Sequence, residues 1–243
     1  MKHSELVLFG GLVAWALGGC AANPVATTPI EATDRGIVPT VRISANLSPR
    51  GGTEGAPSEP QSGHAVEFSA ATARGSDSQT LGAGQPPIIF GGLNTAFNAP
   101  QNLKHEFDFA YYDISWRGRA FFDPNPIGLE VLLGLGYVTL DLAVSSPTQR
   151  AAETLNSAGF SAGIGVIWRI RPATSLQARV TAIALISDFD ELARLEVFVV
   201  QALGRNAAVR AGFSAWRLKA DHDSRSDIKV DFFGPSIGLD VNF

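Results

Sequence analysis

The sequence predicts an all-β fold in which eight antiparallel strands close into a transmembrane barrel, with ten strands as the alternative. Three observations lead to this prediction. Apolar residues alternate with small or polar ones over stretches of about ten residues, the period of a β-strand. Charged residues make up only 17% of the 243-residue chain, below the roughly 25% usual for soluble domains. After residue 20 no apolar run is long enough for a helical span, so strands are expected to cross the membrane.

The chain begins with a short apolar segment that leads to its only cysteine. Lys2 precedes an apolar run over Leu6 to Leu17, and the motif LGGC ends at Cys20. The run is too short for a spanning helix, which needs about 20 apolar residues. It resembles the signal peptide of bacterial lipoproteins, which implies that residues 1–19 are removed and that Cys20 is acylated. An ordinary secretory signal with an incidental cysteine is the alternative.

A segment rich in Pro, Gly, Ser, Thr and Ala follows, over residues 20–63. Its prolines exclude a continuous helix or a central strand. We therefore expect a disordered tether between the lipid and the folded domain, with residues 38–47 as a possible extra strand. The prolines are Pro24, Pro29, Pro39, Pro49, Pro57 and Pro60.

The barrel is expected over residues 64–243. The alternation is clearest in residues 158–168, where Ala, Phe, Ile, Val and Trp share one face and Ser and Gly the other. At ~3.3 Å per residue and a tilt near 40°, ten residues rise about 25 Å, the height of a lipid-facing band. The predicted strands cover residues 66–72, 112–122, 127–137, 158–168, 176–186, 193–203, 207–215 and 233–243.

The connections alternate in length. Those at 123–126, 171–174 and 204–206 are short, whereas those expected at 76–102 and 144–156 are long. Tight turns on one side and longer loops on the other are typical of a barrel with both chain ends in the periplasm.

The Gly- and Ser-rich face suits a narrow interior, which leaves the apolar face for lipid. The chain closes with GPSIGLDVNF, and Phe243 lies on the apolar face. This ending resembles the assembly signal of outer-membrane barrels, which the barrel assembly machinery recognises. Together the patterns over residues 64–243 resemble the small barrels of the OmpA, OmpX and OmpW type. The resemblance, with Ala21 after the cysteine, implies an outer-membrane location and contact with outer-membrane lipid and lipopolysaccharide.

Charges on the inward face need partners, because an isolated charge in a narrow barrel is costly. We expect a luminal charge network that plugs the barrel; a gated ion path is the alternative. Above the apolar band, cations on the last two strands are possible contacts for lipopolysaccharide phosphates, although Arg217 could instead pair with Asp231. The network residues are Glu67, Glu130, Arg179, Arg210 and Asp240, with Asp113, Arg117, Arg194 and Glu196 also inward; the rim cations are Arg217, Lys219 and Lys229.

No motif indicates a cofactor, a metal or an enzyme. His64 and His105 lack metal-ligand spacing, and His222 and Ser224 lie among turn-forming residues. A mildly negative net charge argues against nucleic-acid binding. The predicted function is therefore a non-enzymatic outer-membrane lipoprotein, structural or surface-interacting, with the apolar loop 76–102 as a possible partner site or a cap. A conduit for small apolar molecules is the second hypothesis, and a lipid A-modifying enzyme the third.

Overall fold

The computed structural model describes residues 28–34, 36–47, 62–91, 95–122, 125–186, 189–204, 206–220 and 226–242. Every regular element in this part of the chain is a strand, which confirms the all-β prediction. The elements are β1 (Ile30–Asp34), β2 (Thr40–Asn46), β3 (Gly63–Leu81), β4 (Ile88–Phe90), β5 (Thr95–Phe97), β6 (Gln101–Phe121), β7 (Ile127–Ser145), β8 (Arg150–Arg171), β9 (Thr174–Leu185), β10 (Glu191–Ala202), β11 (Ala207–Ala220) and β12 (Ile228–Asn242).

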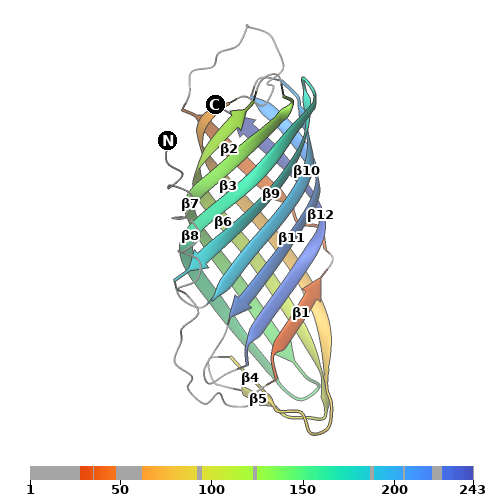
Figure 1. Cartoon of the computed structure of the whole chain (residues 1–243). Helices are drawn as coiled ribbons and strands as arrows, with labels where there is room; N and C mark the ends of the chain where they lie inside the picture. Colours follow the sequence, from red (N-terminus) through yellow and green to blue (C-terminus); the bar gives the residue numbers. More distant parts are fainter. Residues whose placement is uncertain are drawn as a thin grey trace, which may run out of the picture.

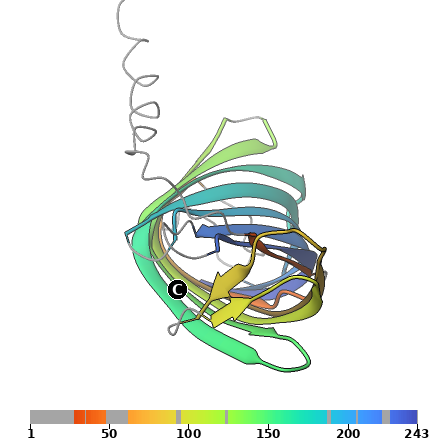
Figure 2. The same cartoon turned by 90° about the horizontal axis from the view of Figure 1, so that it is seen from below.

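All the strands except β4 and β5 form one large sheet that closes on itself (Figure 1). Antiparallel neighbours follow the order β2-β3-β6-β7-β8-β9-β10-β11-β12, and β12 returns to β2. The prediction of eight strands was wrong, because this ring has nine. β1 is a tenth strand of the same sheet, so the ten-strand alternative matches its count. Seen from below, the ring is flattened rather than evenly round (Figure 2).

The closing seam departs from the antiparallel prediction. A ring with an odd number of strands needs at least one parallel pair, and here β12 pairs in parallel with both β2 and β1. The two short strands occupy successive stretches of β12: Ile30 lies opposite Ile228, and Val41 lies opposite Leu239. Between them Val38 donates its backbone N–H to Pro235 O at 3.0 Å.

Both seam strands come from the segment expected to be a disordered tether. Pro29 and Pro39 precede β1 and β2 directly, at positions where the missing N–H removes no ladder hydrogen bond. β2 falls inside the segment 38–47 that was considered as an extra strand. The remaining residues of 20–63 lie largely outside the described part of the chain.

All eight predicted strands exist as β3 and β6 to β12, but four are about twice the expected length. β3 and β7 have 19 residues, β6 has 21 and β8 has 22. The expected long loops 76–102 and 144–156 are therefore mostly strand. β7 and β8 meet in a turn at residues 146–149, and between β3 and β6 lies the small sheet of β4 and β5. These long hairpins extend the lower end of the molecule in Figure 1.

Candidate functional site

Glu67 of β3 is the centre of a buried ionic network inside the closed sheet. Its Oε1 lies 2.7 Å from Arg179 Nη1 of β9, and its Oε2 lies 2.6 Å from Arg117 Nη1 of β6. Arg179 also contacts Glu130 of β7, with 2.6 Å between Nη2 and Oε1. β3 and β9 stand on opposite sides of the ring, so these ion pairs cross the interior.

Arg42 of β2 connects this group of charges to Glu196 of β10. Its Nη2 lies 2.7 Å from Glu196 Oε2, and its Nε lies 3.6 Å from Glu67 Oε1. Nearby, Arg210 Nη1 lies 3.2 Å from Asp240 Oδ1. The five charges predicted for the network therefore all face the interior and form ion pairs, although Arg210 and Asp240 form a pair of their own.

Two members of the network were absent from the predicted set. Arg42 lies in the segment interpreted as tether, and its signal is the alternation of Thr40 to Ser44, in which polar side chains are buried. Arg119 of β6 contacts Glu130, with 2.5 Å between Nε and Oε2. It could have been found because it lies two positions after Arg117, on the same face of a strand.

The network is suited to filling the interior and fixing the strands that surround it. Its carboxylates are held between guanidinium groups, which leaves little freedom for proton transfer or for a ligand. Among the described residues, no group of three or more His, Cys, Asp and Glu side chains could hold a metal ion.

The outward face opposite this network is apolar. On β7 the exposed side chains from Ile127 to Tyr137 are all apolar or aromatic. The same holds on β8 from Phe160 to Trp168, on β10 from Leu195 to Val199, and on β12 from Phe233 to Leu239. We call this surface the apolar belt; its charges lie inside and its apolar groups outside, the reverse of a water-soluble protein.

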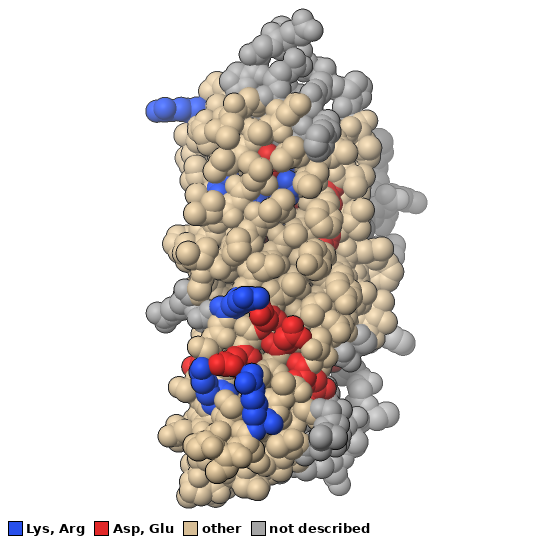
Figure 3. Space-filling view, turned by 180° about the vertical axis from the view of Figure 1, so that it is seen from behind, with Lys and Arg blue, Asp and Glu red and all other residues tan. Residues whose placement is uncertain are grey.

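Beyond the belt the arrangement inverts. Along β6 the inward side chains change from Asp113 and Arg117 to mainly apolar ones between Tyr111 and Leu103, with His105 as the exception. The outward side chains change at the same level, from Tyr112 to charged ones such as Asp108. Figure 3 shows these exposed charges gathered in the lower half, below a broad zone with few charges at its surface. We call this part the outer half.

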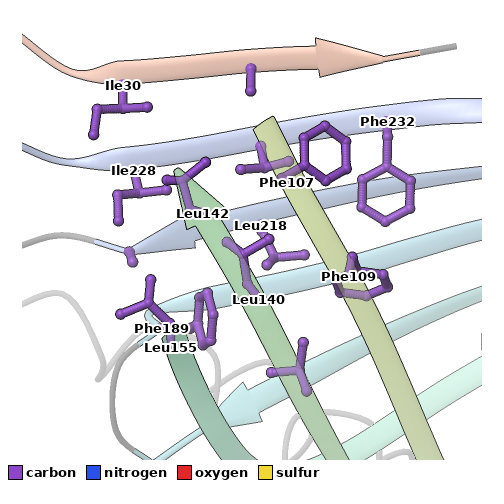
Figure 4. Close-up of a cluster of buried hydrophobic side chains, with 14 of the residues drawn as sticks. Ile30, Phe107, Phe109, Leu140, Leu142, Leu155, Phe189, Leu218, Ile228 and Phe232 are labelled. Atoms are coloured by element: carbon purple, nitrogen blue, oxygen red, sulfur yellow. The ribbon is translucent and has the colours of Figure 1, made fainter. Parts of the chain in front are cut away.

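The outer half has an ordinary apolar core. Rings of Phe109, Trp216 and Phe232 pack with centroids 4.8–5.8 Å apart. Aliphatic side chains such as Leu140 and Leu218 fill the space around them (Figure 4). The core closes the interior at this end of the molecule.

The apolar segment within 76–102 caps this core. Ile88, Phe90 and Phe97 of β4 and β5 are at most 1% exposed. Ser226 fixes β4 through two hydrogen bonds, because its N–H donates to Ile89 O and its Oγ accepts from Ile89 N, both at 3.0 Å. The loop 76–102 was interpreted as a partner site or as a cap, and the burial of these three side chains favours the cap.

The three predicted rim cations lie on the outer half, where their neighbours are acids. Arg217 Nε is 3.1 Å from Asp231 Oδ1, the alternative considered for it. Lys229 Nζ is 3.7 Å from Glu31 Oε1. Lys219 and Lys229 lie directly opposite each other in the β11–β12 ladder, and Glu191 flanks Lys219 on the other side.

Two histidines singled out from the sequence make structural contacts, and four other residues lie outside the described part of the chain. His105 is fully buried, with Nε2 3.0 Å from Gln79 Oε1, and His64 stacks on Trp116. The four residues outside the described part of the chain are Cys20, His222, Ser224 and Phe243.

No family model, curated protein or solved structure matches this chain. Within the described residues, no helix is long and apolar enough to cross a membrane.

Proposed function

We propose that the protein is a lipid-anchored β-barrel of the bacterial outer membrane with a non-enzymatic structural or surface-interaction role. The observation that carries the proposal is the apolar belt wrapped around a charged interior. On β7 it extends over 11 residues, Ile127 to Tyr137, which rise about 25 Å in a tilted strand. That height matches the hydrocarbon region in which such barrels reside.

The outer half supports a surface role. Its outward side chains are charged, its core is apolar, and its cap seals the end, as expected of a part that stands in water. The long hairpins β3–β6 and β7–β8 would extend beyond the lipid and present a charged face to partners outside the cell. This face includes the ion pairs of Arg74 with Asp108 and of Lys104 with Glu106.

The interior argues against conduction. A path along the axis would have to pass the ion pairs around Glu67 and then the aromatic core around Phe109. Because both are filled by side chains, we expect the protein to remain closed to ions. The conduit for small apolar molecules remains the alternative hypothesis, and the packed core of the outer half would have to open to admit them.

The test uses the full chain expressed in a Gram-negative host. We expect labelled palmitate to be incorporated and to be lost in Cys20→Ala, the protein to resist carbonate extraction, and the unboiled protein to migrate differently in SDS gels. Purified protein in planar bilayers is expected to show no steady conductance. Extraction of unacylated protein by carbonate would refute the barrel proposal, and stable channels would replace the plug with the transport hypothesis.

A further inference from the structure

The two ends of the closed sheet differ in exposed charge. At the outer half each of four cations has a carboxylate partner: Arg74 with Asp108, Lys104 with Glu106, Arg217 with Asp231 and Lys229 with Glu31. At the opposite end, where the short turns lie, the described charged side chains outside the interior are Arg169 and Arg171. No exposed carboxylate among the described residues accompanies Arg171.

A β-bulge determines where Arg171 points. Along the β8–β9 ladder Trp168 lies opposite Leu176 and Arg169 opposite Ser175, but Arg171 lies opposite Thr174. The extra residue at 170 shifts the alternation by one, so Arg171 joins Trp168 on the outward face. Their partners on β9 are two positions apart, which separates the two side chains by about 7 Å along the sheet.

The surroundings of Arg171 are apolar and exposed. Trp168 and Ile170 are each 49% exposed, and Ile127 lies opposite Trp168 in the β7–β8 ladder and is 42% exposed. The side chain of Arg169 points toward Phe121 instead, because its guanidinium carbon lies 3.5 Å from the centroid of the Phe121 ring. Arg171 therefore stands at the edge of the apolar belt beside an indole, and it forms no ion pair with a described carboxylate.

We propose that Arg171, with Trp168 and Ile170, binds the phosphate of an anionic phospholipid in the leaflet next to the short turns. This inference rests on the proposed membrane-spanning barrel. An indole and a long cationic side chain at the end of a lipid-facing band are the groups that anchor to the interface. The guanidinium donates two parallel hydrogen bonds to a phosphate, and without a neighbouring acid its charge is available to the lipid.

The experiment measures the lipid that the full protein retains. After flotation with vesicles of phosphatidylcholine and phosphatidylglycerol in equal amounts, the protein is transferred to detergent and its bound lipids are counted by native mass spectrometry. We expect a preference for phosphatidylglycerol that falls about fivefold in Arg171→Gln, the equivalent of about 1 kcal/mol for one basic residue. Arg171→Lys should keep part of the preference. Arg150→Gln, at the outer half beside Glu106, should keep all of it.

Three outcomes would overturn the site. They are equal retention of both lipids by the wild type, an unchanged preference in Arg171→Gln, and an equal loss in Arg150→Gln. Failure of the protein to float with vesicles would count against the proposed barrel itself, so the two proposals fail separately.

Discussion

Glu67 and Arg179 face each other across the closed sheet, from strands β3 and β9, with 2.7 Å between Oε1 and Nη1. Neither side chain is more than 4% exposed. The contact fixes the distance between opposite walls of the interior, in a way that hydrogen bonds between neighbouring strands cannot. It is therefore the most direct place to test what holds the flattened ring together.

Glu67→Gln should destabilise the protein strongly. The substitution keeps the shape but leaves Arg117 and Arg179 short of a buried negative charge. Removal of one partner from a buried pair costs about 3–5 kcal/mol, and contact with the other carboxylates should hold the loss near the lower value. Urea unfolding in detergent micelles measures it. Asp231→Asn is the control, because its pair with Arg217 is exposed and should contribute at most about 1 kcal/mol. Equal losses would show that the interior pairs are solvated.

The parallel seam can be tested with a disulfide. Val41 and Leu239 are opposite each other in the β2–β12 ladder and both are exposed. Neighbouring strands lie about 4.8 Å apart, within the range that a disulfide spans. Val41→Cys with Leu239→Cys should therefore oxidise readily, as seen by faster migration in non-reducing gels.

The matched control for the seam is Val41→Cys with Ile237→Cys. Ile237 is on the same face but two positions along β12, which places the Cα atoms about 8 Å apart, beyond disulfide reach. The single variant Val41→Cys controls for pairing with Cys20. If the control pair forms as readily as the first, β2 does not hold this register and the ring closes in another way.

A close approach of strands at Gly212 predicts sensitivity to the smallest added side chain. A Cβ at Gly212 of β11 would lie 1.9 Å from Val197 O of β10. Gly212→Ala should therefore force the two strands apart and reduce the folded, heat-modifiable fraction in SDS gels. Gly204→Ala, in the turn between β10 and β11, meets nothing within 4 Å and should fold as the wild type does. A normal yield of Gly212→Ala would mean that this ladder is looser than described.

His105 predicts a pH dependence of the outer half. Burial of the imidazole lowers the pKa of His105 below its usual value of 6.5, against the opposing charge of Asp77. Between the folded and unfolded pKa values the folded protein binds fewer protons. The stability that the neutral, buried His105 contributes is therefore complete above about pH 6.5, and it is lost as the pH falls through the pKa of His105 in the folded protein.

The measurement for His105 is the urea midpoint as the pH falls from about 7.5 to about 5, a window below and above the usual histidine pKa. We expect the wild type to lose stability and His105→Gln to lose less. His64→Gln is the control for removal of an imidazole from the surface, where His64 is exposed and stacks on Trp116. An identical slope in all three proteins would assign the pH effect to carboxylates instead.

The sequence indicated the strands of the belt well because one physical constraint governs them. In 158–168 every second residue faces outward, and the same alternation recurs on β9 to β12, so it predicts the face of each single residue there. The ion pair of Arg210 with Asp240 follows from this alternation, because in the belt only the inward face of β11 and β12 carries charge.

The outer half could not be predicted in this way. There the outward residues of β6 are Lys104, Glu106 and Asp108, and the apolar ones turn inward, so the alternation continues while its meaning reverses. A strand identified by one continuous apolar stripe therefore ends where the stripe changes face. β1 was missed, and β2 was considered only as a possible extra strand, for a different reason. Both strands are short, lie among prolines and pair with the distant β12.

The seam also orders the events of folding. Ile30 and Ile228 are partners although 198 positions separate them, and β2 meets β12 over a similar span. Such long-range pairing is slow, since the chain must first lose the entropy of a very large loop. The ring can close only after β12, the last strand of the chain, is available for pairing. Until the seam forms, β2 and β12 are open edges that can pair with other chains. A chaperone that binds β1 and β2 until β12 is available would protect this protein from such pairing during folding.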